Sequence, residues 1–247
     1  VLDELRQQSV DVRLNAQISE IADDCVRLNT GECVKSDLVV LAIGVRPETG
    51  LARAAGIEIG DRGGIKVNQY QQTSDPSIYA VGDAAEKTDA LDGSGALIPL
   101  ANLANRHGRI VADHITGHEV REVESIGTAI VKVFNLTVAT TGWNERRLAA
   151  AQKKHLVIHT HPGSHAGYYP GAEQMHLKLL VDPDTRRILG AQGVGKAGVD
   201  KRIDVIATAM RGGLRADELA DLELCYAPPF GSAKDPVNML GYIADNL

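Results

Sequence analysis

The sequence predicts an α/β region followed by an α+β domain with an antiparallel sheet, and three features support this prediction. A short apolar run, residues 78–81, ends in Gly82-Asp83, and open α/β sheets bind nucleotides at such strand ends. Residues 99–116 have the clearest helical periodicity in the chain. Beyond residue 121, β-prone runs alternate with helical segments, and antiparallel strands flanked by helices make an α+β domain.

Composition limits the classes of partner that the chain fits. The 247 residues suffice for two modest domains, and the apolar fraction of 44% is ordinary for a globular protein. A net charge of −6 provides no broad basic field, so neither nucleic acid nor an anionic membrane is expected as a partner. Cys25, Cys33 and Cys225 do not suggest a disulfide scaffold, which favours a reducing cytoplasm.

Residues 1–49 are expected to hold one helix and several short antiparallel strands. The helix covers residues 2–8, and because the chain starts inside it, we expect a fragment whose N-terminal part is missing. Alternating runs between residues 10 and 43 predict strands, with a turn at residues 29–32. The last run, 38–43, is typical of a buried strand and too short to span a membrane.

The next segment leads to the Gly82-Asp83 pair. Gly56 ends a short helix over residues 51–56, and Asp75-Pro76 makes a turn before the expected strand. A glycine at the carboxyl end of a buried strand lets another molecule approach the backbone. The carboxylate of Asp83 can accept hydrogen bonds from hydroxyl groups, and its charge strengthens those bonds.

One amphipathic helix is expected over residues 99–116. Pro99 suits the first helical position, and Gly117 ends the helix. Its apolar stripe consists of Leu100, Leu103, Ala104, Ile110 and Val111.

The α+β domain is predicted from residue 121 onward. Its strands are expected at residues 128–134, 136–140, 156–159, 175–181 and 187–192. Its helices are expected at residues 145–153, 201–211, 215–220 and 237–245. Asn144, Asp200 and Asp235 each precede a helix and are expected to cap it.

Four segments of the chain are informative together: Gly44–Pro47, Thr73–Asp83, Pro99–Arg109 and Tyr226–Pro236. In order and spacing they resemble segments of the pyridine nucleotide–disulfide oxidoreductases. The last one resembles coenzyme A disulfide reductases and the related NADH oxidases and peroxidases. The resemblance implies the remainder of a Rossmann-like FAD/NAD(P)-binding region. Residues 1–45 would be the end of the NAD(P)-binding domain, 46–120 part of the FAD-binding domain, and 121–247 an interface domain that forms a homodimer.

The resemblance implies a flavoprotein that passes hydride from NADH or NADPH to FAD and then to a redox cysteine. The acceptor would be a disulfide such as coenzyme A disulfide, or a persulfide; oxygen or peroxide is the alternative. Gly82 and Asp83 would bind the ribityl chain of FAD. Pro99, Leu100 and Ala101 would open a helix whose N–H groups stabilise negative charge on the flavin. We expect the chain to lack both the nucleophilic cysteine and the glycine-rich diphosphate loops, and therefore to be inactive by itself.

Tyrosine side chains complete the implied active site from the partner subunit. Tyr226 resembles the tyrosine that approaches the thiol substrate, where it can donate a hydrogen bond or a proton. A second tyrosine of this kind lies in Tyr168-Tyr-Pro-Gly171; the resemblance does not decide between Tyr168 and Tyr169, and Tyr169 is favoured. Cys225 adjoins Tyr226 but is expected to be a packing residue, and Cys25 and Cys33 match nothing catalytic.

The alternative class of function is a non-catalytic dimerisation or metal-binding module. His159 and His161 project to one side of an expected strand, with His165 nearby, and imidazoles so placed can hold zinc or nickel. Neither a cysteine nor an acidic ligand lies close by in the sequence. A solvated strand end is therefore the favoured interpretation, and no metal is expected.

Overall fold

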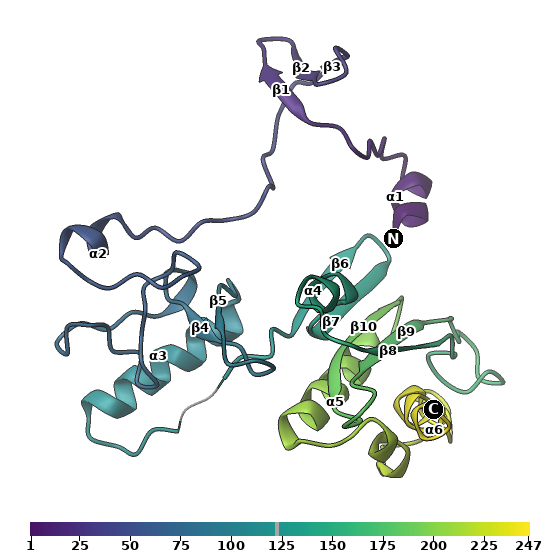
Figure 1. Cartoon of the computed structure of the whole chain (residues 1–247). Coiled ribbons are helices and arrows are strands. Elements are labelled where there is room, and N and C mark those ends of the chain that lie inside the picture. The colour runs from purple at the N-terminus through teal and green to yellow at the C-terminus, as the bar shows by residue number, and fades with distance from the viewer. Residues whose placement is uncertain (122–123) are drawn as a thin grey trace. The chain divides into compact units, whose positions relative to one another are not determined.

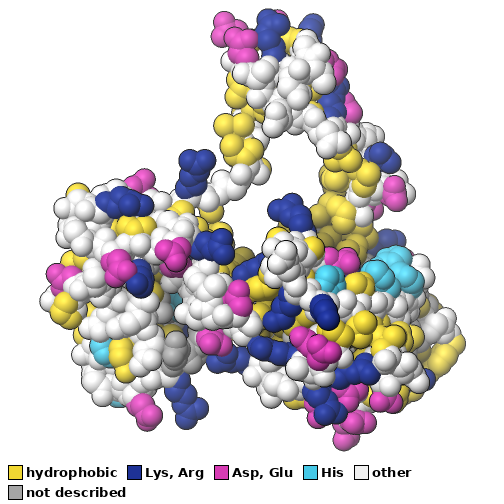
Figure 2. Space-filling view, in the orientation of Figure 1, with side chains coloured by type: hydrophobic (Ala, Val, Ile, Leu, Met, Phe, Trp, Pro, Cys, Tyr) yellow, Lys and Arg dark blue, Asp and Glu magenta, His cyan; other side chains and the backbone are white. Residues whose placement is uncertain are grey.

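The computed structural model describes residues 1–121 and 124–247 (Figure 1). The chain divides into two compact units, Val1–Arg46 and Pro47–Leu247. Within the described residues, we find no helix that combines the length and the apolar character needed to cross a bilayer. On the face drawn in Figure 2, basic and acidic side chains are interspersed, in keeping with the absence of a broad basic field.

The first unit contains one helix and a small antiparallel sheet. Helix α1 spans Leu2–Gln7, and strands β1 (Ile18–Ile21), β2 (Cys25–Leu28) and β3 (Cys33–Lys35) pair in that order. This confirms short antiparallel strands within residues 10–43. The expected buried strand over residues 38–43 is wrong: the segment is not a strand, and Leu38 and Ile43 are 81% and 86% exposed. An apolar run becomes a buried strand only where neighbouring strands pair with its edges and other elements cover its faces.

A disulfide joins Cys25 and Cys33, although the three cysteines of the sequence do not suggest a disulfide scaffold. The residues lie on adjacent strands, and their Cα atoms are 5.7 Å apart, within the usual range for a disulfide. Composition could not reveal this pairing because it depends on the register of β2 against β3. Cys225 is free and exposed, so the expectation that it is a packing residue is wrong.

The region 47–121 holds little regular strand. It contains α2 (Gly50–Ala54), the 3₁₀ turn η1 (Gly82–Ala84), the paired strands β4 (Lys87–Thr88) and β5 (Gly95–Ala96), and α3 (Ala101–Ile115). The strand expected over residues 78–81 is absent, apart from an isolated bridge between Gln72 and Tyr79. Helix α3 is confirmed, but it begins at Ala101, so Pro99 precedes the helix instead of opening it. Its buried face contains Leu103, His107 and Ile110.

The region 124–247 is built on a five-stranded antiparallel sheet, which confirms the predicted architecture. The strand order is β6-β7-β10-β9-β8. The bounds are β6 Ala129–Val133, β7 Leu136–Gly142, β8 Leu156–Thr160, β9 His176–Val181 and β10 Ile188–Gly195. The helical elements are α4 Glu145–Ala150, α5 Val199–Gly212, the 3₁₀ turn η2 Asp217–Asp221 and α6 Pro236–Asp245. The helix expected at residues 215–220 is thus a 3₁₀ turn.

The helix caps of this region are mostly those predicted. Asn144 accepts a hydrogen bond from the amide of Arg147, and Asp235 accepts one from the amide of Val237. Asp200 is not a cap, because α5 already begins at Val199 after Gly198 in the left-handed conformation. A glycine reaches that conformation without the steric cost of a Cβ atom, which explains why the helix can start two residues earlier than expected.

Helices α5 and α6 cover one face of the five-stranded sheet. Their apolar side chains form the main core with the inward-facing residues of the strands; among the fully buried members are Leu177, Leu179, Ile188, Ile203, Ile206 and Leu240. The alternation along β9, with His176 exposed and Leu177 buried, is the period of two that predicted these strands. The core therefore fixes the ends of the strands and helices from which the loops of the candidate site emerge.

Candidate functional site

Two tyrosines that are distant in the sequence meet at the surface of the α+β region. The hydroxyl oxygens of Tyr168 and Tyr226 are 3.1 Å apart, a hydrogen bond in which either can be the donor. Both rings are exposed, 76% for Tyr168 and 49% for Tyr226. The bond to Tyr226 raises the pKa of Tyr168, because it stabilises the protonated phenol against the phenolate. The pair therefore presents phenol hydroxyl groups, which can donate a proton, to solvent.

Backbone hydrogen bonds join the two loops that carry the pair. Tyr168 lies between β8 and β9, and Tyr226 lies between η2 and α6, both outside regular structure. The amide of Ala166 donates to the carbonyl of Gly231 at 2.9 Å and lies 3.3 Å from that of Pro228. Pro228-Pro229 stiffen the second loop, since each proline fixes its own φ.

Tyr169 has different contacts from Tyr168. Its ring packs edge-on against that of His165, with the centroids 5.7 Å apart, and its amide donates to the carbonyl of Ala166. Among the described contacts, none joins Tyr169 to Tyr226. The sequence motif holds two adjacent tyrosines, and only the fold distinguishes the one that reaches Tyr226. The thiol of Cys225 is exposed beside this pair in the sequence.

Gly82 and Asp83 form the start of η1. Gly82 has a φ of +73°, the left-handed region that favours glycine, and it lies against α3, where an added Cβ would be 3.8 Å from that of Ala104. Asp83 is exposed, so its carboxylate is accessible to a ligand hydroxyl. Thr73, in contrast, bonds within its own turn, to the amide and carbonyl of Asp75.

A buried lysine that the sequence analysis missed holds this turn. The ammonium of Lys87 donates to the carbonyls of Gly82 and Ala85, and the residue is 5% exposed. Burial lowers the pKa of Lys87, while the nearby charge of Asp83 acts in the opposite direction. Nothing in the local sequence separates Lys87 from a surface lysine, because its burial depends on α3 packing over the turn.

The first turn of α3 offers free backbone donors. Its N-cap residue, Leu100, has extended backbone and makes no side-chain capping bond, and both Ala101 and Asn102 are exposed. The first N–H groups of a helix have no acceptor within the helix and attract negative charge. Pro99 is also exposed. Together with Asp83, this helix start fits a ligand that combines hydroxyl groups with an electron-rich ring edge, as FAD does.

The three histidines of the metal hypothesis do not come together. His161 instead meets His176, with their Nδ1 atoms 2.8 Å apart, and His165 bonds the carbonyl of Ala166. His159 lines the same open sheet surface as His161 and His176. Within the described part of the chain, no group of three or more His, Cys, Asp or Glu side chains is arranged to hold a metal ion.

A glycine run in this region has the spacing of a dinucleotide-binding loop, Gly193-Val-Gly-Lys-Ala-Gly198, so the expected absence of such a run is wrong. Its glycines serve packing. A Cβ at Gly193 would be 2.7 Å from Val199, and one at Gly195 would be 2.9 Å from Met175. The run thus lets α5 approach β10 closely inside an antiparallel sheet, a setting different from the parallel sheet that binds dinucleotides.

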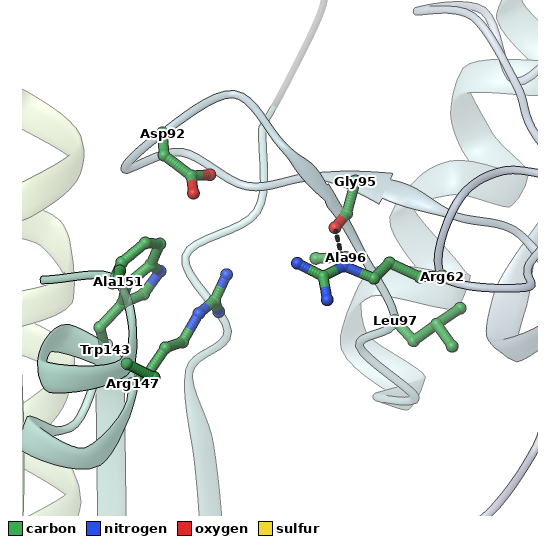
Figure 3. Close-up of a pocket in the computed structure, with 9 residues that line it drawn as sticks. Arg62, Asp92, Gly95, Ala96, Leu97, Trp143, Arg147 and Ala151 are labelled. Atoms are coloured by element: carbon green, nitrogen blue, oxygen red, sulfur yellow. Dashed lines mark hydrogen bonds between the residues drawn. The ribbon is translucent and has the colours of Figure 1, made fainter.

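A cavity of about 490 Å³ lies apart from the predicted residues (Figure 3). One side of the cavity is formed by the 92–97 loop and Arg62, and the other by Arg147 of α4 and Trp143, which precedes that helix. The guanidinium groups of both arginines point toward the cavity. Both arginines already have partners: Arg62 donates to the carbonyl of Gly95, and Arg147 pairs with Asp89. The cavity therefore offers no catalytic arrangement of its own.

Comparison with known proteins gives one consistent match. A family model described as pyridine nucleotide-disulphide oxidoreductase matches residues 1–108, and the model of that family's dimerisation domain matches residues 128–236. The coenzyme A disulfide reductase of Staphylococcus haemolyticus is 36% identical over 248 residues, which cover 100% of this chain and 56% of that protein. The chain thus spans about half the length of the curated relatives it matches.

Two solved structures are similar over nearly the whole chain. Reduced CoADR-RHD of Bacillus anthracis has 47% identity and a TM-score of 0.96, covering 99% of this chain and 44% of that one. An NAD-dependent persulfide reductase from A. fulgidus has 38% identity and a TM-score of 0.95, covering 99% of this chain and 46% of that one.

Proposed function

Because the chain belongs to the pyridine nucleotide-disulphide oxidoreductase family, we propose that it forms part of an FAD-dependent enzyme that reduces a disulfide or persulfide with NADH or NADPH. The complete enzyme is called the flavoenzyme below. Coenzyme A disulfide is the disulfide we favour, because relatives named for that substrate align with essentially the whole chain. The observation that carries the proposal is the exposed Tyr168–Tyr226 pair, in a segment that resembles coenzyme A disulfide reductases.

The residues present fit FAD, which when bound would accept hydride from NAD(P)H and pass the electrons to a redox cysteine. We propose that Asp83 accepts a hydrogen bond from a ribityl hydroxyl, since its carboxylate is exposed. Gly82 would keep the backbone open to the cofactor. The N–H group of Ala101, after Pro99 and Leu100, would stabilise negative charge on the bound ring system.

The tyrosine pair is assigned to the thiol step. Reduction of a disulfide by NAD(P)H consumes one proton and yields two thiols, so one departing sulfur must acquire a proton or a hydrogen bond. We propose that the Tyr226 hydroxyl supplies it, with Tyr168 hydrogen-bonded behind it. This assignment prefers Tyr168 to Tyr169, because Tyr168 is the one in contact with Tyr226.

We also propose that the enzyme is a homodimer and that it works in the cytoplasm, where NAD(P)H is available. The matched dimerisation domain, residues 128–236, supports the dimer and contains both tyrosines. A two-fold interface would place the pair of each subunit near the other subunit's redox centre.

The proposal is tested by purifying the flavoenzyme and following NAD(P)H oxidation with different acceptors. We expect a flavin absorption spectrum and faster oxidation with coenzyme A disulfide or a persulfide than with oxygen or peroxide. Faster turnover with oxygen or peroxide would assign the chain to an oxidase or peroxidase. A protein without flavin and without NAD(P)H oxidation would contradict the proposal altogether.

A further inference from the structure

Tyr168 and Tyr226 can stay in contact only if the two loops that carry them are held in place. The two residues are 58 positions apart in the sequence, and both lie in loops with exposed rings. Loops of this kind move more than the elements they connect. Their hydroxyl groups nevertheless lie within hydrogen-bonding distance. Backbone hydrogen bonds of Ala166 join the two loops, and a buried side chain that bonds both loops would add to this support.

Arg202 is the largest fully buried side chain at the base of these loops. It projects from the first turn of α5 and is 1% exposed. Its Nη2 donates to the carbonyl of Ser164 at 3.1 Å and to the carboxylate of Asp235 at 2.9 Å, and its Nη1 donates to the carbonyl of Gly198 at 3.1 Å. One guanidinium group thereby joins the Tyr168 loop, the start of α5 and the cap of α6.

The same guanidinium group lies directly beneath the Tyr226 loop. A Cβ at Gly231 would be 3.6 Å from Nη2 of Arg202 and 3.9 Å from the carbonyl oxygen of Cys225, the residue before Tyr226. The carbonyl of Gly231 is the acceptor for the amide of Ala166. Arg202 therefore supports both sides of the contact between the loops.

The guanidinium group of Arg202 is better suited to orienting its acceptor groups than to raising the stability of the fold. A buried ion pair often adds little stability over an apolar group of the same size, because both charges lose their hydration. A planar guanidinium group with five donors, in contrast, fixes several acceptors in one geometry, which an ammonium group on a flexible stem does less well. The ammonium group of Lys201, the residue before Arg202, is 4.0 Å from the carboxylate of Asp235 and is partly exposed.

We propose that Arg202 is a positioning residue for the tyrosine pair: it holds the loops of Tyr168 and Tyr226 in register without contacting substrate. The effect of Arg202 on catalysis rests on the proposed function. Its role in holding the two loops does not. Arg202 fixes the hydroxyl pair through Ser164 on one side and through Asp235 and the Gly231 segment on the other.

The structural part is tested on this chain by ¹⁹F NMR of 3-fluorotyrosine, with Tyr168 and Tyr226 assigned by substitution. In Arg202→Lys we expect the raised pKa of Tyr168 to fall toward that of an ordinary exposed tyrosine, because its bond to Tyr226 is lost. Asp235→Asn is the second variant, since asparagine still caps a helix while the ion pair is lost. Arg186→Met is the matched control: Arg186 bonds the carbonyl of Ala244 at the far end of α6.

The outcomes separate clearly. Folded Arg202→Lys and Asp235→Asn chains with unchanged tyrosine titration would overturn the inference. Global unfolding of both would overturn it as well, because Arg202 would then support the whole domain and not the loops. An equal change in Arg186→Met would overturn the inference too, because the loss of the tyrosine contact would then follow from general loosening of the domain and not from Arg202.

The catalytic part is tested in the flavoenzyme by measuring the two half-reactions separately. Arg202→Lys is expected to slow reduction of the disulfide substrate by about 100-fold, since a displacement of a catalytic group by about 1 Å can cost that much, and to leave flavin reduction unchanged. If Tyr226→Phe has no effect, the proposed role of the tyrosines is wrong. If Tyr226→Phe slows the disulfide step and Arg202→Lys does not, only the positioning role is wrong.

Discussion

The indole nitrogen of Trp143 donates to both carboxylate oxygens of Asp89, at 3.1 and 3.0 Å, in a contact that is buried on both sides. The guanidinium group of Arg147 pairs with the same carboxylate at 2.7 Å and lies over the Trp143 ring. Asp89 also accepts from the amide of Leu91. This carboxylate therefore joins the segment after Gly82-Asp83 to the first helix of the α+β region.

We predict that Trp143→Phe lowers the free energy of unfolding by about 1–3 kcal/mol, because it leaves a buried carboxylate short of one donor. Asp89→Ala should cost at least as much, since it leaves the buried indole N–H of Trp143 and the amide of Leu91 without an acceptor, at about 1–3 kcal/mol for each buried group left unpaired. Urea unfolding of the chain measures both, with Asp184→Ala, at an exposed turn position, as the control. Wild-type stability in Trp143→Phe would refute the assigned role.

His107 is predicted to make the fold sensitive to acid. Burial in α3 lowers its pKa to about 4, with further contributions from the charges of Lys87 and Arg106. An unfolded histidine takes up its proton near pH 6.5, about 2.5 pH units before the folded one. Stability is therefore complete above pH 6.5 and is lost as the pH falls toward 4.

The measurement is the unfolding temperature of the chain and of His107→Leu at pH 7.5 and pH 5. We expect the substitution to remove part of the loss between these values and to leave the variant at least as stable at pH 7.5, because Nδ1 of His107 is buried without a partner among the described residues. Identical pH dependence of both proteins would contradict the prediction.

The sequence predicted the parts of the fold that local chemistry determines. Helix α3 and the strands of the five-stranded sheet follow from periodicity, and the caps Asn144 and Asp235 follow from side-chain acceptors next to helix starts. The apolar runs 38–43 and 78–81 failed as strand predictions because a strand needs neighbours that a local pattern does not report.

The candidate site depends more on tertiary structure. The Gly82-Asp83 and Tyr226 motifs can be found in the sequence, but the choice of Tyr168 over Tyr169 depends on two loops meeting across the domain. Lys87 and Arg202 resemble surface residues in the sequence, and only the packing around them explains their burial. The Cys25–Cys33 pairing likewise follows from strand register.

Asp83 is predicted to contribute directly to cofactor retention. In the flavoenzyme, Asp83→Ala should weaken FAD binding by about 1.5–3 kcal/mol, the usual value of a hydrogen bond to a charged group. Equilibrium dialysis of FAD measures the loss, and Asp184→Ala, on a distant turn, should change nothing. Unchanged affinity in Asp83→Ala would refute the assignment.

The chain alone is predicted to hold FAD weakly or not at all. Diphosphate groups of nucleotides bind to free N–H groups of glycine-rich loops, whereas the glycine run 193–198 is occupied by core packing. Gel filtration of the chain after incubation with FAD is the test. Coelution of one flavin per chain would contradict this prediction.

We predict that the chain is a dimer in solution. The region 128–236 matches a dimerisation domain and buries its own core, so it can present a two-fold interface without further residues. Sedimentation equilibrium should give twice the mass of one chain, and a chain of residues 47–247 should behave in the same way. A monomer at micromolar concentration in both cases would exclude the dimer.

The role of Tyr226 in the thiol step is tested by rapid mixing of the flavoenzyme, which measures the two half-reactions separately. We predict that Tyr226→Phe leaves reduction of the flavin by NAD(P)H unchanged and slows reduction of the disulfide substrate by about 10²- to 10⁴-fold, the range for loss of a general acid. Tyr168→Phe should slow the same step by less, because its hydroxyl contacts Tyr226. Equal slowing of both half-reactions by Tyr226→Phe, or no slowing of either, would contradict the account.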